Sequence, residues 1–435
     1  QFPKSLSAFV KNEYKSEVRA FKDFAGWAEL DLNTFSDKLL MNGFVNPSDS
    51  VASIAKIFAR QTPQKFTADE ILPSTTGSFL TMGISDAEKY FWDYRGFLKE
   101  RGQLTGYNNA LQSLNNAYGT QFPEQLLKLT DKEFTIGFDG STPKGSAPRI
   151  YALFRIRSKT ETESGFRDIL SKIAATESKT IADYHTRYRF DAELEFDIYH
   201  LPVRKFTAKV FGSIFGVLDE HYYTVLDNYL VFADSRESLM YLIQSSILNK
   251  TLQTNAAYKE FENNTSPRSN LCFYCNLSYG QGFYSTYLTQ LINNQWMNNL
   301  GIFQRLQVAG VQLYSSNGML YSNLLLKHLS SFKGTTQTVW ESKLDTIANF
   351  KPVFVMNHQT RKNDVFVQDL KNNIYLINQA GRILWKIRLA NRINSEVFQV
   401  DYFRNGKFQL LFSTEDELYL IDRNGNFVER YPVKL

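Results

Sequence analysis

The sequence has little cysteine: only Cys272 and Cys275 occur among 435 residues, which excludes a disulfide-stabilised scaffold. Their C-x-x-C spacing also occurs in redox and zinc sites. The surrounding stretch, 270–277, has the composition of a β-strand, in which residues three apart point to opposite faces. A zinc site would need two further ligands, and the five histidines show no metal-ligand spacing. We therefore predict two separately buried cysteines that form neither a disulfide nor a metal site.

Long apolar runs and a strong excess of charge are also missing. No uninterrupted run approaches the roughly 18 residues of a membrane-spanning helix, and no signal peptide is recognisable. The formal net charge is +5 and basic residues alternate with acidic ones, which argues against nucleic-acid binding. The chain is therefore predicted to be soluble. Because it begins at Gln1 without a Met, it is compatible with the removal of an upstream segment.

Motifs that carry catalytic chemistry are absent from the sequence. We find no Gly-x-Ser-x-Gly elbow, Walker loop, His-Glu-x-x-His or Gly-x-Gly-x-x-Gly. Residues 422–426 resemble part of a calcium loop, but the glycine comes too early and no bidentate Glu follows, so an Asn-Gly turn explains them. We therefore predict that the protein is not an enzyme and has no catalytic, cofactor-binding or metal-binding residue. Its histidines are expected to be structural or exposed: His185, His200, His221, His328 and His358.

Aromatic residues are abundant: 35 Phe and 24 Tyr favour half-buried, pleated surfaces and therefore strands. Hydrophobic residues make up 43% and charged residues 21%, as in globular proteins, and the length predicts two or three domains. Between residues 190 and 203, apolar residues alternate with Glu193, Glu195 and Asp197. We interpret these three carboxylates as the solvated face of a strand and not as a cation site.

Helix and strand signals alternate in the first part of the chain. A capping box at Ser85 to Glu88 opens a helix with one apolar face. That face carries Tyr90, Phe91, Tyr94, Phe97 and Leu98. Further signals predict a second helix near 107–118 and strands at 78–83, 133–138 and 150–157.

A hairpin is predicted over 222–233, with a two-residue turn at Asp227-Asn228. A capping signal at 234–237 then opens a helix that runs to about 247. Together with the preceding elements, this order predicts an α+β fold in which helices pack on largely antiparallel sheets.

A weak internal repeat relates two hairpins. Residues 27–32 followed by 38–42 resemble residues 311–314 followed by 319–323, and each pair comes after a helical segment. We interpret residues 1–66 as the tail of a truncated first α+β repeat and residues 67–330 as a second α+β repeat.

Residues 331–435 contain a clearer repeat. The strand 374–378 with Gly381 recurs 44 residues later as 418–422 with Gly425, and Trp340 and Trp385 lie 45 residues apart. A period of 40–45 residues with about four strands is typical of a β-propeller. About two blades fit into this region, so we predict propeller-like β repeats that form an incomplete propeller.

Five sets of residues carry a resemblance to a known family: 26–32, 40–44, 209–215, 222–225 with 229–232, and 419–426. They resemble an uncharacterised envelope family of Bacteroidetes that is catalogued as a domain of unknown function, and the resemblance spans nearly the whole chain. It implies a cell-envelope location that faces the periplasm or the cell surface. It also implies longer natural chains, with an N-terminal membrane or lipid anchor that is absent here, a preceding α+β repeat and further propeller-like sequence. It transfers no catalytic residue.

The sequence thus favours a non-catalytic envelope scaffold or protein-interaction subunit whose partners are other envelope proteins. Trp92, Trp296 and the segment 279–287 carry aromatic residues that either form part of that interface or, as we expect, pack in the core. One alternative is a periplasmic lipid or glycan carrier, which a cavity beneath the 85–98 helix would favour. Another is a quinoprotein-like enzyme, because residues 374–385 resemble the repeat of quinone-cofactor propellers, in which the tryptophan is structural.

Overall fold

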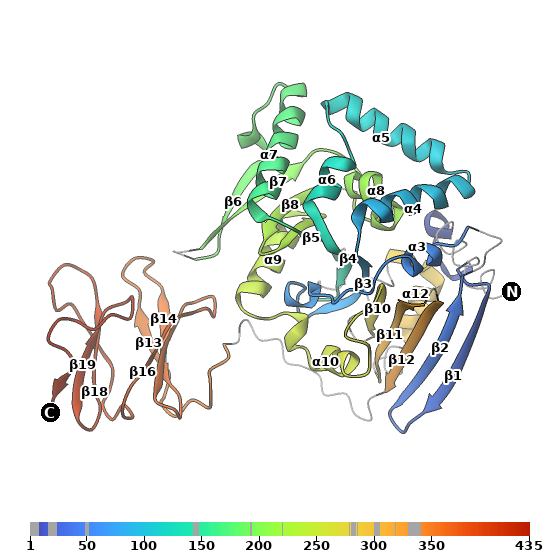
Figure 1. Cartoon of the computed structure of the whole chain (residues 1–435). Helices are drawn as coiled ribbons and strands as arrows, with labels where there is room; N and C mark the ends of the chain where they lie inside the picture. Colours follow the sequence, from blue (N-terminus) through green and yellow to red (C-terminus); the bar gives the residue numbers. More distant parts are fainter. Residues whose placement is uncertain are drawn as a thin grey trace. The chain divides into compact units, whose positions relative to one another are not determined.

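A computed structural model describes residues 8–15, 24–47, 52–141, 148–191, 194–219, 221–277, 279, 284, 286–299, 305–317, 319–328, 340 and 342–435. The chain divides into two compact units (Figure 1). The first comprises residues 1–188 and 196–333, and the second comprises residues 189–195 and 334–435.

The first unit is built on one large antiparallel sheet. Its strands lie in the order β1 (Trp27–Thr34), β2 (Lys38–Asn46), β12 (Met319–His328), β11 (Leu306–Ser316), β10 (Leu271–Asn276), β3 (Thr76–Ile84), β4 (Thr130–Asp139), β5 (Arg149–Ile156), β9 (Tyr229–Ala233), β8 (His221–Leu226), β7 (Glu195–Leu201) and β6 (His185–Arg189). Strands from both ends of the unit's sequence therefore meet in one sheet, where β2 pairs with β12.

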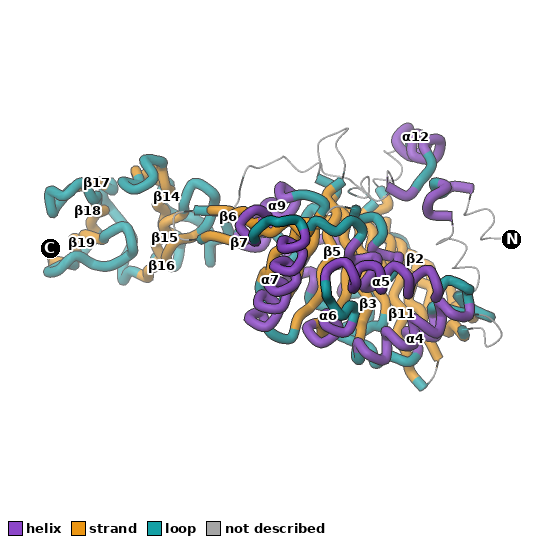
Figure 2. Tube along the Cα trace, turned by 90° about the horizontal axis from the view of Figure 1, so that it is seen from above, coloured by secondary structure: helices purple, strands orange, loops and turns teal. Residues whose placement is uncertain are grey.

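Helices cover both faces of this sheet. One face is covered by α4 (Ala87–Glu100), α5 (Leu104–Tyr118), α6 (Glu124–Leu129), α7 (Lys159–Thr176) and α8 (Phe206–Phe211), of which α4 to α7 lie together on one side of the strands in Figure 2. The other face is covered by η3 (Ala68–Glu70), α9 (Arg236–Ile247), η6 (Leu252–Thr254) and α10 (Ala256–Glu262). The other helices within the described residues are η1 (Asn12–Tyr14), α3 (Ala55–Ala59), η4 (Ile181–Tyr184), η5 (Ser213–Phe215) and α12 (Gln290–Asn298).

Successive side chains of β5 pack alternately against the helices on the two faces of the sheet. Ala152 and Phe154 belong to the apolar cluster beneath α4 to α8, whereas Tyr151 and Leu153 belong to the cluster beneath α9 and α10. All four side chains are fully buried. A strand buried on both faces reads as a continuous apolar run, as this one does.

The described residues of the second unit form two four-stranded antiparallel sheets. One contains β13 (Val353–Met356), β14 (Asn363–Gln368), β15 (Asn373–Ile377) and β16 (Ile383–Arg388), and the other contains β17 (Phe398–Val400), β18 (Gln409–Ser413), β19 (Glu417–Ile421) and β20 (Val433–Lys434). Phe366 of the first sheet and Phe412 of the second lie in one apolar cluster, with ring centroids 5.5 Å apart. Within the described residues these two sheets form no closed ring.

Two tryptophans make the same contact in this unit. Trp340 packs on Gly381, where an added Cβ would lie 2.9 Å from the ring, and Trp385 packs on Gly425, where the distance would be 3.0 Å. Both glycines have positive φ angles, 84° and 87°. The tight ring contact and the backbone conformation together favour glycine at both turns.

The predicted mixed fold with large antiparallel sheets is confirmed, and one helix start is corrected. The cap of α4 is Asp86, whose side chain accepts a hydrogen bond from the Lys89 amide, and not Ser85. Ser85 is engaged elsewhere: its hydroxyl donates to Gln61 Oε1 at 2.9 Å and accepts from the Thr62 amide. The predicted 222–233 hairpin forms as β8 and β9, and α9 is capped by Ser235.

Candidate functional site

Strand β1 forms an open edge of the large sheet. It pairs with β2, and no other described strand lies beside it. All eight of its residues are exposed, including Trp27 (50%), Leu30 (41%) and Leu32 (56%). Natural proteins usually protect edge strands with charge, proline or a covering element. Glu29 and Asp31 place charge on one face of β1, but Leu30 and Leu32 leave the other face apolar and exposed, which indicates an interaction site.

The two hairpins that meet in this sheet, β1–β2 and β11–β12, are related by an approximate two-fold axis. Asn42 of β2 pairs with Asn323 of β12, 281 residues away. The same shift of 281 residues converts the pair Leu32 and Met41 of the first hairpin into the pair Leu313 and Ser322 of the second. Both hairpins therefore have one register, as the sequence similarity between 27–42 and 311–323 predicted for the strands.

The equivalent hairpins differ in how they are covered. The outer edge of β11 pairs with β10, and Leu313 is only 4% exposed, whereas its counterpart Leu32 is 56% exposed. Leu320 is fully buried, whereas its counterpart Leu39 is 37% exposed. Since the backbone pairing is the same, the β1 edge has the geometry that in β11 accepts an antiparallel strand.

A pocket of about 270 Å³ lies on the same four strands, across the two-fold axis. It is lined by Asp31, Asn42, Gly43, Phe44, Tyr314, Tyr321, Ser322 and Asn323. The rings of Tyr314 and Tyr321 stack with centroids 5.2 Å apart, and Phe44 lies 4.4 Å from Tyr321. Asn323 donates through Nδ2 to the Asn264 carbonyl, while its buried Oδ1 has no hydrogen-bond partner among the described residues. This surface combines aromatic rings with amide groups.

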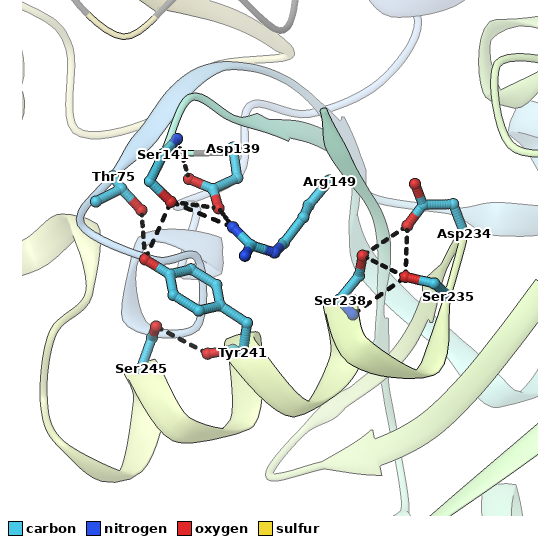
Figure 3. A network of polar contacts seen from close by, with 9 residues as sticks. All are labelled: Thr75, Asp139, Ser141, Arg149, Asp234, Ser235, Ser238, Tyr241 and Ser245. Carbon is cyan, nitrogen blue, oxygen red and sulfur yellow. Dashed lines mark hydrogen bonds and ion pairs between the residues drawn. The ribbon is translucent and has the colours of Figure 1, made fainter. Parts of the chain in front are cut away.

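A polar network at the far end of β4 and β5 is neutralised internally (Figure 3). The buried Asp139 carboxylate accepts from Arg149 at 2.8 Å and from the Ser141 hydroxyl at 2.9 Å. The Arg149 guanidinium lies 4.1 Å from the centre of the Tyr241 ring. Nearby, Asp234 accepts from Ser238, and burial raises the pKa of Asp234. Because neighbouring donors satisfy these carboxylates, removal of a single partner would destabilise the fold.

A second buried carboxylate, Glu133, anchors η3 to the sheet. It accepts from the backbone amides of Thr67 and Ala68 at 2.8 and 3.0 Å and from the Tyr229 hydroxyl at 2.9 Å. Burial raises the pKa of Glu133. The neighbouring Asp69 has its pKa raised to about 7 by burial and by the charges of Glu262, Glu133 and Glu70.

The predicted separate burial of the two cysteines in one strand is confirmed. Cys272 and Cys275 are both free and buried in β10, and they belong to different apolar clusters. Burial raises the pKa of each thiol to about 12. The thiols are therefore protonated and unreactive at neutral pH.

The predicted solvated carboxylates are exposed in β7 and make ion pairs. Glu195 accepts from Arg189 at 2.7 Å, and Asp197 lies 2.7 Å from His185 Nε2. Glu193 lies outside the described residues. In the turn at 422–426, the Asp422 carboxylate accepts from the backbone amides of Asn424 and Asn426, as expected of a turn.

The aromatic residues expected in the core divide into two groups. Trp296 packs on Tyr284, with ring centroids 4.2 Å apart. Trp92 is 65% exposed on α4, so the expectation of core packing is wrong for this residue. The helical position explains this, because Trp92 follows Phe91 and points away from the face that docks on the sheet. Among the histidines, His221 is buried beside Thr207, and burial lowers its pKa to about 4.

Comparisons with protein-family models, curated proteins and solved structures return no match. Within the described part of the chain, no helix has the length and apolar character required to cross a membrane. The same part contains no cluster of three or more His, Cys, Asp or Glu residues placed to bind a metal. The sequence did not indicate that the edge of β1 is open, although the weak hairpin repeat predicted the strands β1 and β2.

Proposed function

We propose that this protein is a non-catalytic scaffold or protein-interaction subunit of the cell envelope, within a larger membrane-associated assembly, and that it binds its partner through the β1 edge. The observation that carries this proposal is the contrast between two hairpins of equal register, one covered by a strand and one open. Addition of a strand to an open edge is a recurrent mode of protein recognition.

The proposed occupant is an antiparallel strand from another α+β unit of this type, with the side-chain pattern of β10. The two-fold relation places such a strand beside β1, because β10 holds that position beside β11. Apolar side chains of the incoming strand would cover Leu30 and Leu32, which are exposed on one face of β1. Pairing of β1 with a second copy of itself is less favourable, because Glu29 and Asp31 would bring like charges close together.

The envelope location is supported by the sequence resemblance, and a propeller-like second unit is supported by its repeated contacts. Trp340 packs on Gly381 as Trp385 packs on Gly425, so each sheet receives a tryptophan from the segment before it. The strand order within the two sheets is also the same. Stacked sheets with a repeated tryptophan contact are typical of blades in a propeller.

The test is binding of a fluorescent peptide with the sequence of residues 268–278, in which both cysteines are replaced by serine. We expect saturable binding to the full chain, weakened at least tenfold by the double substitution Leu30→Lys and Leu32→Lys. Leu291→Lys, at an exposed position of α12, serves as the matched control and should bind the peptide as the wild type does. Equal binding of the peptide by the wild type and by the double variant would refute the proposed occupant.

A second candidate, a glycan carrier, is favoured by the pocket that Phe44, Tyr314 and Tyr321 line beside Asn42 and Asn323. Saturation-transfer NMR with chitobiose should show contacts that Tyr321→Ala removes. Lipid carriage beneath α4 has no comparable support, since Tyr90, Tyr94 and Leu98 pack there in the same buried cluster as Phe134.

A further inference from the structure

A bulge interrupts the pairing of β4 with β5. Thr130 pairs with Ile156, but the next pair is Phe134 with Phe154. Three residues of β4 therefore face Arg155 alone, and Lys132 within the bulge has a φ of 47°. Bulges of this kind redirect side chains and are common beside functional sites.

The bulge borders an open pocket of about 520 Å³. Its lining residues are Asp131, Lys132, Arg155, Ile156, Arg157 and Asn228. Three cationic side chains and one carboxylate thus surround the same space. Lys132 Nζ lies 3.9 Å from Asp131 Oδ2, which partly balances its charge.

The two arginines of the pocket are held by neutral oxygen atoms. Arg157 donates through Nε to the Thr130 carbonyl at 3.0 Å, and Arg155 donates through Nη1 to Thr67 Oγ1 at 3.2 Å. Neither arginine has a carboxylate within ion-pair distance among the described residues. A guanidinium has five N–H donors, so each retains donors and a full positive charge.

The Arg155 side chain is held by Thr67, which has hydrogen-bond partners of its own in the core. The Thr67 hydroxyl that receives its hydrogen bond lies 2.6 Å from the Tyr229 hydroxyl, and the Thr67 amide donates to Glu133. Thr67 is thus held by the anchoring contacts of the buried carboxylate. This places the guanidinium of Arg155 on a rigid part of the sheet and reduces the entropy lost when it binds a ligand.

We propose that the bulge pocket, independently of the β1 edge, binds the phosphate group of a small ligand through Arg155 and Arg157, with Lys132 contributing charge. A planar guanidinium matches the geometry of phosphate oxygens and can donate two parallel hydrogen bonds. The pocket is open and larger than a phosphate ion, so it has room for a larger molecule that carries the group, either soluble or a lipid.

The first experiment is calorimetric titration of the full chain with inorganic pyrophosphate at low ionic strength. We expect one saturable site, with affinity reduced at least tenfold by Arg157→Gln and less by Arg157→Lys, which keeps the charge but loses the planar fork. Arg236→Gln is the matched control, since this exposed arginine lies beyond the other end of β9 and pairs with Glu237. Added NaCl should weaken binding. Absence of saturable heat, or equal binding by Arg157→Gln and wild type, overturns the proposal.

The source of the phosphate is distinguished by vesicle sedimentation. If the ligand is a lipid, vesicles of phosphatidylglycerol should bind wild type more tightly than vesicles of phosphatidylcholine, and Arg157→Gln should remove the difference. If the ligand is soluble, both kinds of vesicle should leave the protein in solution while pyrophosphate still binds. If Arg157→Gln binds phosphatidylglycerol vesicles as tightly as the wild type, the result counts against the site. It would show that the protein binds anionic vesicles through its general surface charge.

Discussion

The hairpins β1–β2 and β11–β12 have the same register and meet in one sheet, yet their side chains have different surroundings. Leu313 and Leu320 are buried, whereas their counterparts Leu32 and Leu39 are exposed. Strand pairing alone therefore does not decide whether these leucines contribute to stability. The elements that cover the hairpin decide it, and the four predictions below test that conclusion.

The largest difference is expected between Leu320→Ala and Leu39→Ala. Leu320 is fully buried against Val45 and Ala55, so its truncation leaves a cavity and should lower the free energy of unfolding by about 2–4 kcal/mol. Leu39→Ala should cost about 1 kcal/mol or less, because its side chain already contacts water. Urea unfolding of both variants measures the difference, and equal losses would show that the open hairpin is as well packed as the covered one.

The free energy of unfolding is expected to depend on pH through Asp69, which lies near the covered hairpin β11–β12. Leu325 of β12 packs in the same apolar cluster as Ala68, beside Asp69, whereas its counterpart Phe44 lines the open pocket. The pKa of Asp69 is raised from 3.8 to about 7 by burial and neighbouring carboxylates. Between these values the unfolded chain has lost the proton that the folded protein keeps, so the free energy of unfolding should fall as pH rises through this window.

The variant Asp69→Asn isolates this contribution. It should show a smaller fall in the free energy of unfolding between pH 4 and pH 7 than the wild type, because its side chain does not titrate. Urea unfolding at several pH values provides the measurement. Identical slopes for the two proteins would contradict the assignment.

A third prediction concerns the tighter backbone contact in the open hairpin. A Cβ added at Gly43 would lie 1.9 Å from the Glu29 carbonyl oxygen, whereas the counterpart Leu324 carries a full side chain. Gly43→Ala should therefore cost about 1–3 kcal/mol and speed amide exchange in β1. Gly106→Ala in α5 is the control, since nothing lies within 4 Å of its added Cβ and the helix should gain stability. Unchanged exchange in β1 would refute the predicted backbone clash.

The smallest difference in stability is expected between variants of Asn42 and Asn323, which pair with each other at the two-fold axis. Asn323 donates a hydrogen bond to the Asn264 carbonyl, so Asn323→Ala should cost about 1 kcal/mol. Asn42 has no side-chain hydrogen bond among the described residues, so Asn42→Ala should change stability by less than about 0.5 kcal/mol. Thermal unfolding of the two variants measures the difference. Equal losses of stability for Asn323→Ala and Asn42→Ala would contradict this expectation.

Local patterns were sufficient to predict much of the fold. The composition of the stretch around Cys272 and Cys275 predicted the strand β10, and the Asp227-Asn228 turn predicted the hairpin of β8 and β9. The repeated Asn42 and Asn323 segments gave two similar hairpins. What the sequence did not predict was their pairing with each other, because that contact joins residues 281 positions apart.

The candidate sites depended even more on tertiary structure. In the sequence, Arg155 and Arg157 are ordinary polar positions at the end of a predicted strand. Their pocket exists because β4 has extra residues opposite Arg155, and a bulge of this kind has no local sequence signal here. The open edge of β1 was likewise invisible, since an apolar alternating strand reads the same whether or not a neighbour covers it.

The two-fold pairing of β2 with β12 also has a consequence for assembly. Two separate hairpins that met in this way would form a dimer whose population would fall on dilution. Here both halves belong to one polypeptide, so the effective concentration of each for the other is fixed by the chain between them. The central join of the large sheet is therefore independent of protein concentration, whereas the proposed occupancy of the β1 edge by another unit should depend on how much of that partner is present.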